Sequence, residues 1–424
     1  MMDLGRLGLG ERHGRELEPM RIFLSAGEPS GDLHAANLIE SIRRLRPDAE
    51  FVGYGGPRMA QTGAEVLFPL VDMAVMWFWR VLLNIRTFIG LVGKADRYFR
   101  DERPDAVVLI DYPGLHWWIA KKAKKRGIPV FYYVPPQIWA WAAWRVNKVR
   151  KYVDHVLCSL PFEPAWYHAR NVPQAKYVGH PYFDELLERG LDSKFMEEEK
   201  KRGGPVVAIL PGSRTQEVTR NFPVMLRAAV ALSKDQPGLG ARFVVACLHD
   251  RHKRLVEAMV EVANVGSSFP IEIHAARTPE LIRLADIAWA VSGSVGLELM
   301  MEALPTVVLY KVNRLDLIIA RPFIKARFIS LVNLLADAEL FPEYLTERDV
   351  SGELAGWAAR WLCDPEERAK ASRTLVALRE TAAKPGASDR AAAEIVEVLR
   401  GSAYRGPHDR AGVESEGPTV RRGG

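Results

Sequence analysis

The chain has 424 residues, of which 48% are hydrophobic and 26% are charged, and its net charge is +6. This composition excludes a fibrous or wholly disordered protein, and the length predicts two domains of about 150–200 residues each. The three cysteines lie far apart and form no C-x-x-C pair, which argues against a disulfide framework or a zinc site. The positive charge favours an anionic partner: nucleic acid, a phospholipid surface or a phosphorylated small molecule.

Short apolar runs alternate with helix-like segments, which predicts parallel sheets with crossover helices. The expected strands are 21–25, 106–110, 129–134 and 153–158 in the first half, and 206–210, 242–247, 271–274, 287–292 and 306–312 in the second, with helices that include 223–234 and 251–264. The sequence therefore predicts an α/β fold with two Rossmann-like domains facing a central cleft, which is the usual ligand site of that architecture.

Composition changes along the chain set the expected boundaries. We expect a disordered extension at 1–19, a first domain at 20–188, a charged, Gly/Pro-tipped linker at 189–205, a second domain at 206–349, C-terminal helices at 350–400 and a disordered tail at 401–424. Residues 1–19 contain no apolar core of a secretory signal, and Met20 is a candidate for the native start.

Residues 70–92 form an apolar stretch interrupted by Asp72, Arg80 and Arg86, so they do not predict a membrane span. Two readings stay open: a buried core helix, or a helix lying in a membrane interface. The second reading is preferred because tryptophan is abundant there, and its membrane-facing residues would be Val75, Trp77, Phe78, Trp79, Leu82 and Leu83.

The stretch "AGEPSGDLHAANLI" at 26–39 follows a strand and opens a helix, where backbone N–H groups can hold an anion. It matches neither G-x-G-x-x-G nor the P-loop pattern, and Glu28 and Asp32 place negative charge where a phosphate would lie. Carboxylates at this position are better suited to accept hydrogen bonds from sugar hydroxyls than to lie beside a phosphate. The alternative is that Ser30 or Asp32 only caps the helix.

Asp111, in "LIDYPGLHWW", stands at the carboxyl end of an apolar strand and is followed by Pro113 and Gly114. A carboxylate there can act as general base toward a hydroxyl. The alternative is an aspartate that fixes its own turn.

The segment "YYVPPQIWAWAAWRVNKVRK" at 132–151 places aromatic residues beside cations. Such residues can stack on nucleic-acid bases or lie at a lipid headgroup layer. The alternative is a tryptophan-lined core with a solvated basic helix face. The residues of interest are Gln137, Trp139, Trp141, Trp144, Arg145, Lys148, Arg150 and Lys151.

Two small-residue turns in the second half predict a nucleotide-diphosphate site. "ILPGSRTQEV" offers open backbone at Gly212 and Ser213, and Arg214 offers a two-pronged guanidinium for phosphate oxygens. "VSGSVGLELM" follows a later strand, and a carboxylate one turn into its helix can reach ribose hydroxyls. Its members are Gly293, Ser294, Gly296 and Glu298. The chain contains no D-x-D, so we expect no metal bridge at the diphosphate and no cofactor.

These motifs, together with "LPFE", "YVGHP" and "FISLVNLLADAELFPEYL", occur in the order found in lipid-A-disaccharide synthases, and the resemblance covers about residues 20–345. It implies an inverting, metal-independent GT-B glycosyltransferase. The donor would be UDP-2,3-diacylglucosamine and the acceptor 2,3-diacylglucosamine 1-phosphate. The resemblance further implies a peripheral location at the cytoplasmic side of the inner membrane, an anionic phospholipid surface as partner, no nucleic-acid partner and a homodimer as one option.

Carried over by motif, Asp111 resembles the family's essential aspartate, Arg214 the arginine that holds the diphosphate, and Glu298 the ribose contact. Asn333, unremarkable by itself, resembles an amide of the donor site. The acceptor-side residues would be Ser30, Gly31, Asp32, Gln137 and Trp139. His180 matches a family motif, but its role does not follow from the residues.

Two segments depart from the family pattern; we expect the first change to be benign, and the second bears on the donor. Pro135 stands where serine is usual, and "GSVGLE" replaces the commoner G-T-x-T-L-E, which removes two hydroxyls near the phosphates. Another GT-B enzyme, either an epimerase or a peptidoglycan-type transferase, is therefore the alternative enzyme. A basic membrane- or nucleic-acid-binding module is the non-enzymatic alternative.

Overall fold

The computed structural model describes residues 19–71, 85–314 and 326–403. The described chain forms two compact units, the first with residues 19–71, 85–109, 114–130 and 392–403, and the second with residues 110–113, 131–314 and 326–391.

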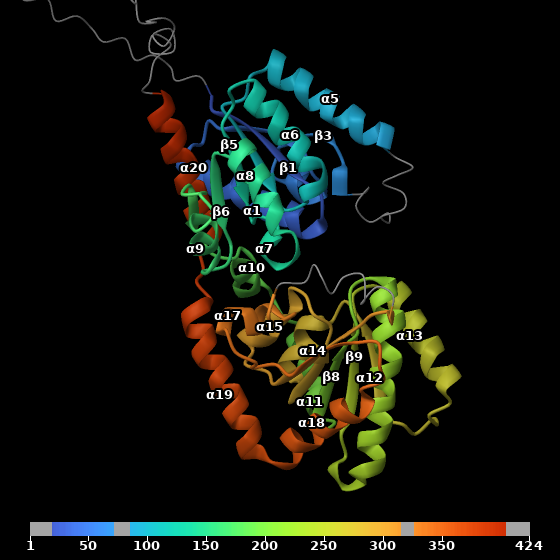
Figure 1. The fold of residues 1–424 in the computed structure, drawn as a ribbon. Coiled ribbons are helices and arrows are strands. Elements are labelled where there is room, and N and C mark those ends of the chain that lie inside the picture. Colours follow the sequence, from blue (N-terminus) through green and yellow to red (C-terminus); the bar gives the residue numbers. More distant parts are fainter. Residues whose placement is uncertain (1–18, 72–84, 315–325, 404–424) are drawn as a thin grey trace, which may run out of the picture. The chain divides into compact units, whose positions relative to one another are not determined.

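Strands and helices alternate along most of the chain up to residue 200 (Figure 1). They are β1 (Arg21–Ala26), α1 (Pro29–Leu45), β2 (Glu50–Tyr54), α2 (Pro57–Gln61), β3 (Glu65–Phe68), α5 (Ile85–Asp101), β4 (Ala106–Ile110), α6 (Pro113–Lys125), β5 (Val130–Tyr133), α7 (Ile138–Trp141), α8 (Val146–Tyr152), β6 (His155–Cys158), α9 (Glu163–His168), β7 (Ala175–Tyr177), α10 (Tyr182–Glu188) and α11 (Ser193–Lys200).

The alternation then continues to the last described strand, and three helices follow that strand. These elements are β8 (Val206–Leu210), α12 (Thr215–Asp235), β9 (Arg242–Cys247), α13 (Asp250–Ala263), β10 (Ile271–Ala275), α14 (Thr278–Leu284), β11 (Ile287–Ala290), α15 (Val295–Met301), β12 (Thr306–Lys311), α17 (Leu331–Ala336), β13 (Glu343–Thr346), α18 (Ser351–Cys363), α19 (Pro365–Ala382) and α20 (Ala387–Ala403).

Both sheets have the strand order of a doubly wound fold. The first runs β3-β2-β1-β4-β5-β6-β7 and the second β10-β9-β8-β11-β12-β13. Each described strand pairing in the second sheet is parallel. The order reverses next to β1 and next to β8, and ligands of open α/β sheets bind at the carboxyl ends of the strands at such a reversal.

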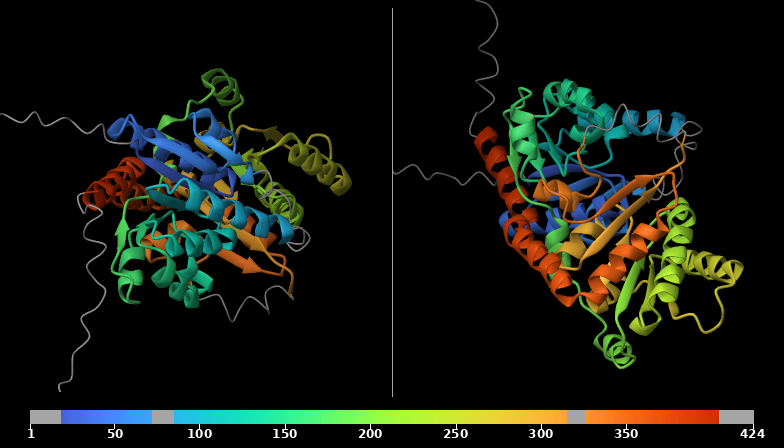
Figure 2. Two further views of the ribbon diagram at one scale, coloured as in Figure 1. Left: turned by 90° about the horizontal axis from the view of Figure 1, so that it is seen from above. Right: turned by 60° about the horizontal axis from the view of Figure 1, so that its bottom comes forward.

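The second sheet is buried on both faces because its strands alternate between two cores. In β8, Val207 and Ile209 belong to the core covered by α12 and α18, whereas Ala208 and Leu210 belong to the opposite core. Helices α18 and α19 pack on each other, α18 against α12 and α19 against α15 (Figure 2). A continuous apolar run was therefore the correct sequence signal for these strands.

Helix α12 begins eight residues before its predicted start. The predicted helix began at Pro223, a residue without the N–H that an interior helix position donates. In the structure Pro223 lies inside the helix. The buried side chain of Asn221 donates to the Glu217 carbonyl at 2.7 Å and accepts the Lys311 N–H at 2.8 Å, which ties this part of α12 to β12.

Several elements were not predicted because their sequences are short or polar. Strands β2, β3, β7 and β13 are among them, and β13 reads "EYLT". Part of the expected linker forms α11. No helix in the described ranges combines the length and the apolarity needed to cross a bilayer. The six predicted membrane-facing residues, Val75, Trp77, Phe78, Trp79, Leu82 and Leu83, lie outside the described residues.

Candidate functional site

The two predicted phosphate turns leave neighbouring strands of the second sheet. Leu210 at the end of β8 pairs with Ala290 at the end of β11, so the segments that follow, 211–214 and 291–294, begin side by side. This edge is the carboxyl end of the sheet at the point where its strand order reverses. The structure therefore brings the two predicted donor turns together.

At the β8 turn, a carboxylate of the protein occupies the backbone donors. Glu217 accepts the N–H of Ser213 at 3.0 Å and that of Arg214 at 3.2 Å, and it also pairs with the Arg214 guanidinium at 3.1 Å. Gly212 has φ +127°, and a Cβ there would lie 2.4 Å from the Glu217 Cβ, so this position requires glycine. Because Glu217 holds these N–H groups, a phosphate that binds them must displace the carboxylate. The Arg214 side chain itself is 71% exposed and therefore accessible.

At the β11 turn, the backbone is open. Gly293 and Ser294 are exposed, and among the described residues, its chain neighbours aside, no heavy atom lies within 4 Å of the position that a Cβ at Gly293 would take. Gly296 is buried against Val332, and a Cβ at Gly296 would lie 3.7 Å from that side chain. A ligand can therefore approach the main chain closely at Gly293 and Ser294.

Glu298, the predicted ribose contact, is buried and already paired. Its carboxylate accepts the Tyr182 hydroxyl at 3.1 Å and an Arg189 N–H at 3.0 Å. Burial raises the pKa of Glu298 above its ordinary value, while Arg189 and Tyr182 oppose that rise. A ribose hydroxyl would have to share this carboxylate with Tyr182 and Arg189, neither of which the sequence singled out.

Asn333, the predicted donor-site amide, is fully buried and has every amide group engaged within the protein. Its NH₂ donates to the Phe341 carbonyl at 2.7 Å and to Glu343 at 2.9 Å, and its oxygen accepts the N–H groups of Leu340 and Phe341, both at 2.8 Å. In this structure Asn333 therefore clamps the segment between α17 and β13 and presents no amide group to a donor.

Asp111 lies on a strained turn at the end of β4. Asp111 and Tyr112 have φ values of 51° and 47°, in the left-handed region that most residues avoid. The Tyr132 hydroxyl donates to the Asp111 carbonyl at 2.9 Å. Val134, at the end of β5, has φ 50°, which is costly for a β-branched residue. Strain of this kind concentrates at functional sites, so these turns are candidate active-site elements.

The predicted acceptor residues Ser30, Gly31 and Asp32 lie in the first turn of α1 in the first unit. Ser30 is exposed, but Asp32 is buried and accepts three backbone N–H groups, from Gly56 at 2.7 Å, Arg58 at 2.9 Å and Met59 at 3.1 Å. The Asp32 carboxylate caps the start of α2. It therefore does not cap its own helix, and its oxygens are already engaged where a sugar hydroxyl would have to bind. It thereby fixes the Gly55–Gly56 turn.

Gln137 and Trp139, the other acceptor-side predictions, differ in exposure. Gln137 is exposed, whereas Trp139 is buried in the core on one face of the second sheet. The Trp139 indole donates to Glu163 at 3.0 Å, and the same carboxylate accepts the N–H groups of Ser159 at 3.0 Å and Leu160 at 2.9 Å. Trp139 is therefore a core residue that anchors α7.

Glu163 makes stability depend on pH. Burial raises the pKa of Glu163 to about 7, although the hydrogen bonds from Leu160 and Trp139 oppose this. Between the unfolded value of about 4.5 and about 7 the folded protein holds the extra proton, so stability decreases as the pH rises through that window. We expect the unfolding free energy of the wild type, relative to Glu163→Gln, to fall by about 2–4 kcal/mol between pH 4.5 and 7.5. Urea unfolding at several pH values measures this, and a constant difference would mean that Glu163 is ionised throughout.

His180 lies in a turn that the start of α20 holds. Burial lowers the pKa of His180 to about 4, so the ring is neutral at ordinary pH, and its Nδ1 accepts the Tyr182 N–H at 3.2 Å. Arg390 donates to the Val178 carbonyl at 2.7 Å, and a Cβ at Gly179 would lie 2.5 Å from that guanidinium. These contacts give the "YVGHP" segment a structural role.

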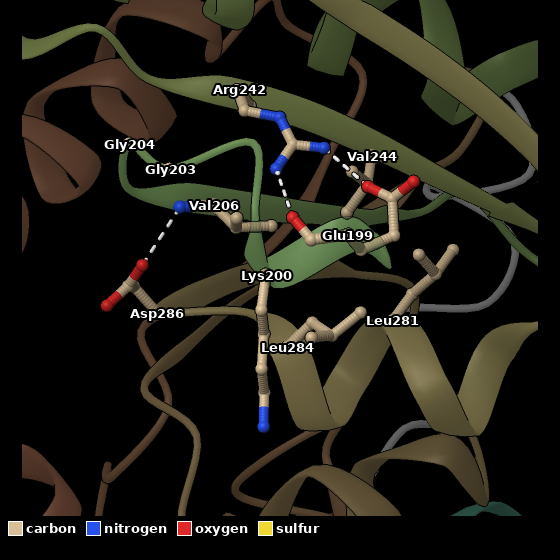
Figure 3. A pocket seen from close by; sticks show the side chains of 10 residues that line it. All are labelled: Glu199, Lys200, Gly203, Gly204, Val206, Arg242, Val244, Leu281, Leu284 and Asp286. Carbon is tan, nitrogen blue, oxygen red and sulfur yellow. Dashed lines mark hydrogen bonds and ion pairs between the residues drawn. The ribbon is translucent and has the colours of Figure 1, made fainter. Parts of the chain in front are cut away.

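The amino end of the second sheet carries a separate small cavity of about 150 Å³ (Figure 3). Val206 and Arg242, the first residues of β8 and β9, line it. Nearby, Glu199, Glu272 and His274 offer ligand atoms within 4.8 Å of one another, but Arg242 pairs with Glu199 at 2.5 Å and with Glu272 at 2.9 Å. A cation would have to displace this guanidinium, and the cavity lies at the edge opposite to the donor turns.

Comparisons with known proteins point to one family. A family profile described as lipid-A-disaccharide synthetase matches residues 22–396. The lipid-A-disaccharide synthase of Myxococcus xanthus is 35% identical and that of Anaeromyxobacter dehalogenans 36% identical, each over 90% of this chain and 98% of the relative.

Solved structures resemble this chain in fold. The co-structure of S. aureus MnaA with UDP aligns with a TM-score of 0.64 at 12% identity, covering 90% of this chain and 97% of that one. UDP-GlcNAc 2-epimerase from Neisseria meningitidis, bound to UDP-GlcNAc, aligns with a TM-score of 0.59 at 13% identity. The alignment covers 90% of this chain and 100% of that one. The predicted GT-B fold with two parallel α/β sheets is confirmed.

Proposed function

Because the chain belongs to the lipid-A-disaccharide synthase family of glycosyltransferases, we propose that it joins UDP-2,3-diacylglucosamine to 2,3-diacylglucosamine 1-phosphate. The products are the β-1,6-linked disaccharide 1-phosphate and UDP. The family match over residues 22–396 carries this proposal. The accessible Arg214 and the open turn at Gly293, both at the switch point of the second sheet, support a UDP-sugar donor there.

In the proposed mechanism, Asp111 is the general base. It takes the proton of the acceptor 6-hydroxyl as that oxygen attacks the anomeric carbon of the donor, and the bond from that carbon to UDP breaks with inversion. Arg214 and the backbone of the β11 turn stabilise the negative charge on the leaving diphosphate. We propose no metal at this step, because the chain has no D-x-D and a guanidinium is in place.

We propose that residues 20–188 bind the acceptor and residues 206–349 bind the donor. The protein acts at the cytoplasmic side of the inner membrane as a peripheral protein, which its net charge of +6 suits because anionic phospholipids attract basic proteins. Light scattering in detergent distinguishes a monomer from the proposed homodimer.

The deciding experiment measures UDP release by purified protein in detergent micelles, with UDP-2,3-diacylglucosamine and with or without the acceptor. We expect acceptor-dependent release that EDTA leaves unchanged. Release without acceptor would point to a hydrolase or epimerase. Binding of UDP without any release would mean that the sugar substrates are wrong, and would direct attention to the altered "GSVGLE" turn.

A further inference from the structure

Two exposed tryptophans and one arginine form a cluster between α7 and α8. The side chains of Trp141 and Trp144 are 46% and 61% exposed, in contrast to the buried Trp139. The guanidinium carbon of Arg145 lies 4.4 Å from the centroid of the Trp141 ring and 5.2 Å from that of Trp144. We call these three residues the Trp–Arg cluster. Its arginine is held in place by two aromatic faces.

The guanidinium of this cluster lacks a counter-ion among the residues that the structure describes. Within the ranges 19–71, 85–314 and 326–403, the Arg145 guanidinium makes no hydrogen bond and no ion pair, whereas Arg189 and Arg242 of the same unit pair with carboxylates. Burial lowers the pKa of Arg145 below its ordinary value, as expected for a partly desolvated cation without an acid beside it. Five N–H donors are therefore ready for an anion.

The surrounding sequence intensifies the positive charge. From Tyr112 to Val153 the chain contains no Asp or Glu, and it contains nine Lys and Arg residues. Lys148 lies 6.0 Å from the Trp144 ring centroid on the next turn. This stretch offers a partner only cations, which favours an anionic partner, although Asp111 and Asp154 flank it directly.

The chemistry of the cluster matches a phosphate carried by a lipid. A guanidinium binds two phosphate oxygens at once, which a soluble anion would satisfy equally well. The exposed indoles favour a lipid over a soluble anion, because tryptophan favours the boundary between water and hydrocarbon. Single-stranded nucleic acid suits the cluster less well, since bases stack on free ring faces and Arg145 covers a face of each indole.

The cluster also lies within electrostatic reach of the candidate base. Tyr132 donates a hydrogen bond to the Asp111 carbonyl. Burial raises the pKa of Tyr132 well above its ordinary value, the Asp111 carboxylate raises it further, and Arg145 lowers it. The charges of Asp111 and Arg145 therefore both act on Tyr132. The Trp–Arg cluster thus lies near Asp111, the residue proposed to deprotonate the acceptor.

We propose that Trp141, Trp144 and Arg145 form a binding site for the phosphate group of a lipid. Two lipids carry such a group: an anionic phospholipid of the bilayer, and the phosphorylated acceptor. The acceptor source rests on the proposed function, whereas the bilayer source does not. The two sources are separated by binding measurements, neither of which requires turnover.

The first measurement is co-sedimentation with vesicles of phosphatidylcholine that contain 30% phosphatidylglycerol or none. Arg145→Ala is compared with Arg150→Ala, a matched control that removes the same charge from the adjacent exposed helix face, where the Arg150 side chain bonds only to Asn147 among the described residues. A non-specific basic charge near such a surface is worth about fivefold in binding. We expect Arg150→Ala to stay within that range and Arg145→Ala to lose more than tenfold on the anionic vesicles.

The second measurement is binding of 2,3-diacylglucosamine 1-phosphate in detergent micelles, with the same lipid lacking the phosphate as reference. If the acceptor is the source, Arg145→Ala weakens binding of the phosphorylated lipid more than tenfold and leaves the reference and UDP binding unchanged. Trp144→Ala should weaken binding in whichever assay Arg145→Ala does, and circular dichroism melting checks that both variants fold.

A selective loss in either assay supports the proposal and names the source of the phosphate. Equal behaviour of Arg145→Ala and Arg150→Ala in both assays overturns it. Tight binding of a uridine oligonucleotide that Arg145→Ala abolishes, without lipid binding by the wild type, also overturns it in favour of nucleic acid. Failure of the UDP-release assay with an intact Arg145 effect on vesicles would reject the proposed function alone.

Discussion

Asp111→Asn is expected to lower kcat by about 10²–10⁴-fold while the affinity for UDP stays within about twofold of the wild type. The amide cannot take a proton from the acceptor hydroxyl, so the loss reports general-base catalysis. Initial rates of acceptor-dependent UDP release give kcat, and calorimetric titration with UDP gives the affinity. Unchanged kcat would remove Asp111 from the mechanism.

Asparagine is the informative replacement because of the backbone at this turn. Asp111 has φ 51°, and asparagine adopts the left-handed region more readily than other residues except glycine. The carbonyl that accepts the Tyr132 hydroxyl is retained in any variant. Asp111→Ala removes the same base but adds strain at positive φ, of order 1 kcal/mol. A larger loss of thermal stability in Asp111→Ala than in Asp111→Asn would separate strain from chemistry.

The sequence predicted the second sheet well because burial on both faces leaves a plain signal. Strands β8 and β9 coincide with the predicted 206–210 and 242–247; β8 is apolar throughout, and β9 is apolar after its first residue, Arg242. Strand β13, "EYLT", lacks that signal, because what specifies it is pairing with β12 and not its own composition. Such pairing depends on residues 35 positions away and cannot be recognised locally.

For the site, the sequence predicted positions better than partners. The turns at Gly212 and Gly293 follow strands, so their placement at one edge of the sheet follows from topology. The partners depend on which groups folding brings within hydrogen-bond distance. Examples are the contacts of Glu298 with Arg189 and of Asn333 with the 340–343 segment. The contacts of Glu217 also lack the usual capping signal, since the cap residue three positions before it is Arg214 and not Ser, Thr, Asp or Asn.

Arg214→Ala is expected to weaken UDP binding by about 10–150-fold, because a hydrogen bond to a charged group contributes about 1.5–3 kcal/mol. In the unliganded protein the same change should cost little stability. Its side chain is 71% exposed and its described ion pair, with Glu217 three residues later, is of the solvent-screened kind that contributes about 0–1 kcal/mol. Arg214→Ala should therefore lower the affinity for UDP without lowering the free energy of unfolding by more than about 1 kcal/mol.

Arg227→Ala is the matched control, since Arg227 lies on the same helix and pairs with the exposed Asp349 at 2.7 Å, away from the switch-point turns. We expect UDP affinity within about twofold of the wild type in that variant. If Arg214→Ala and Arg227→Ala bind UDP equally well, the diphosphate does not contact Arg214. The N–H groups of Ser213 and Arg214 would then stay with Glu217 in the complex, and the open main chain at Gly293 and Ser294 would have to stabilise the leaving group without that guanidinium.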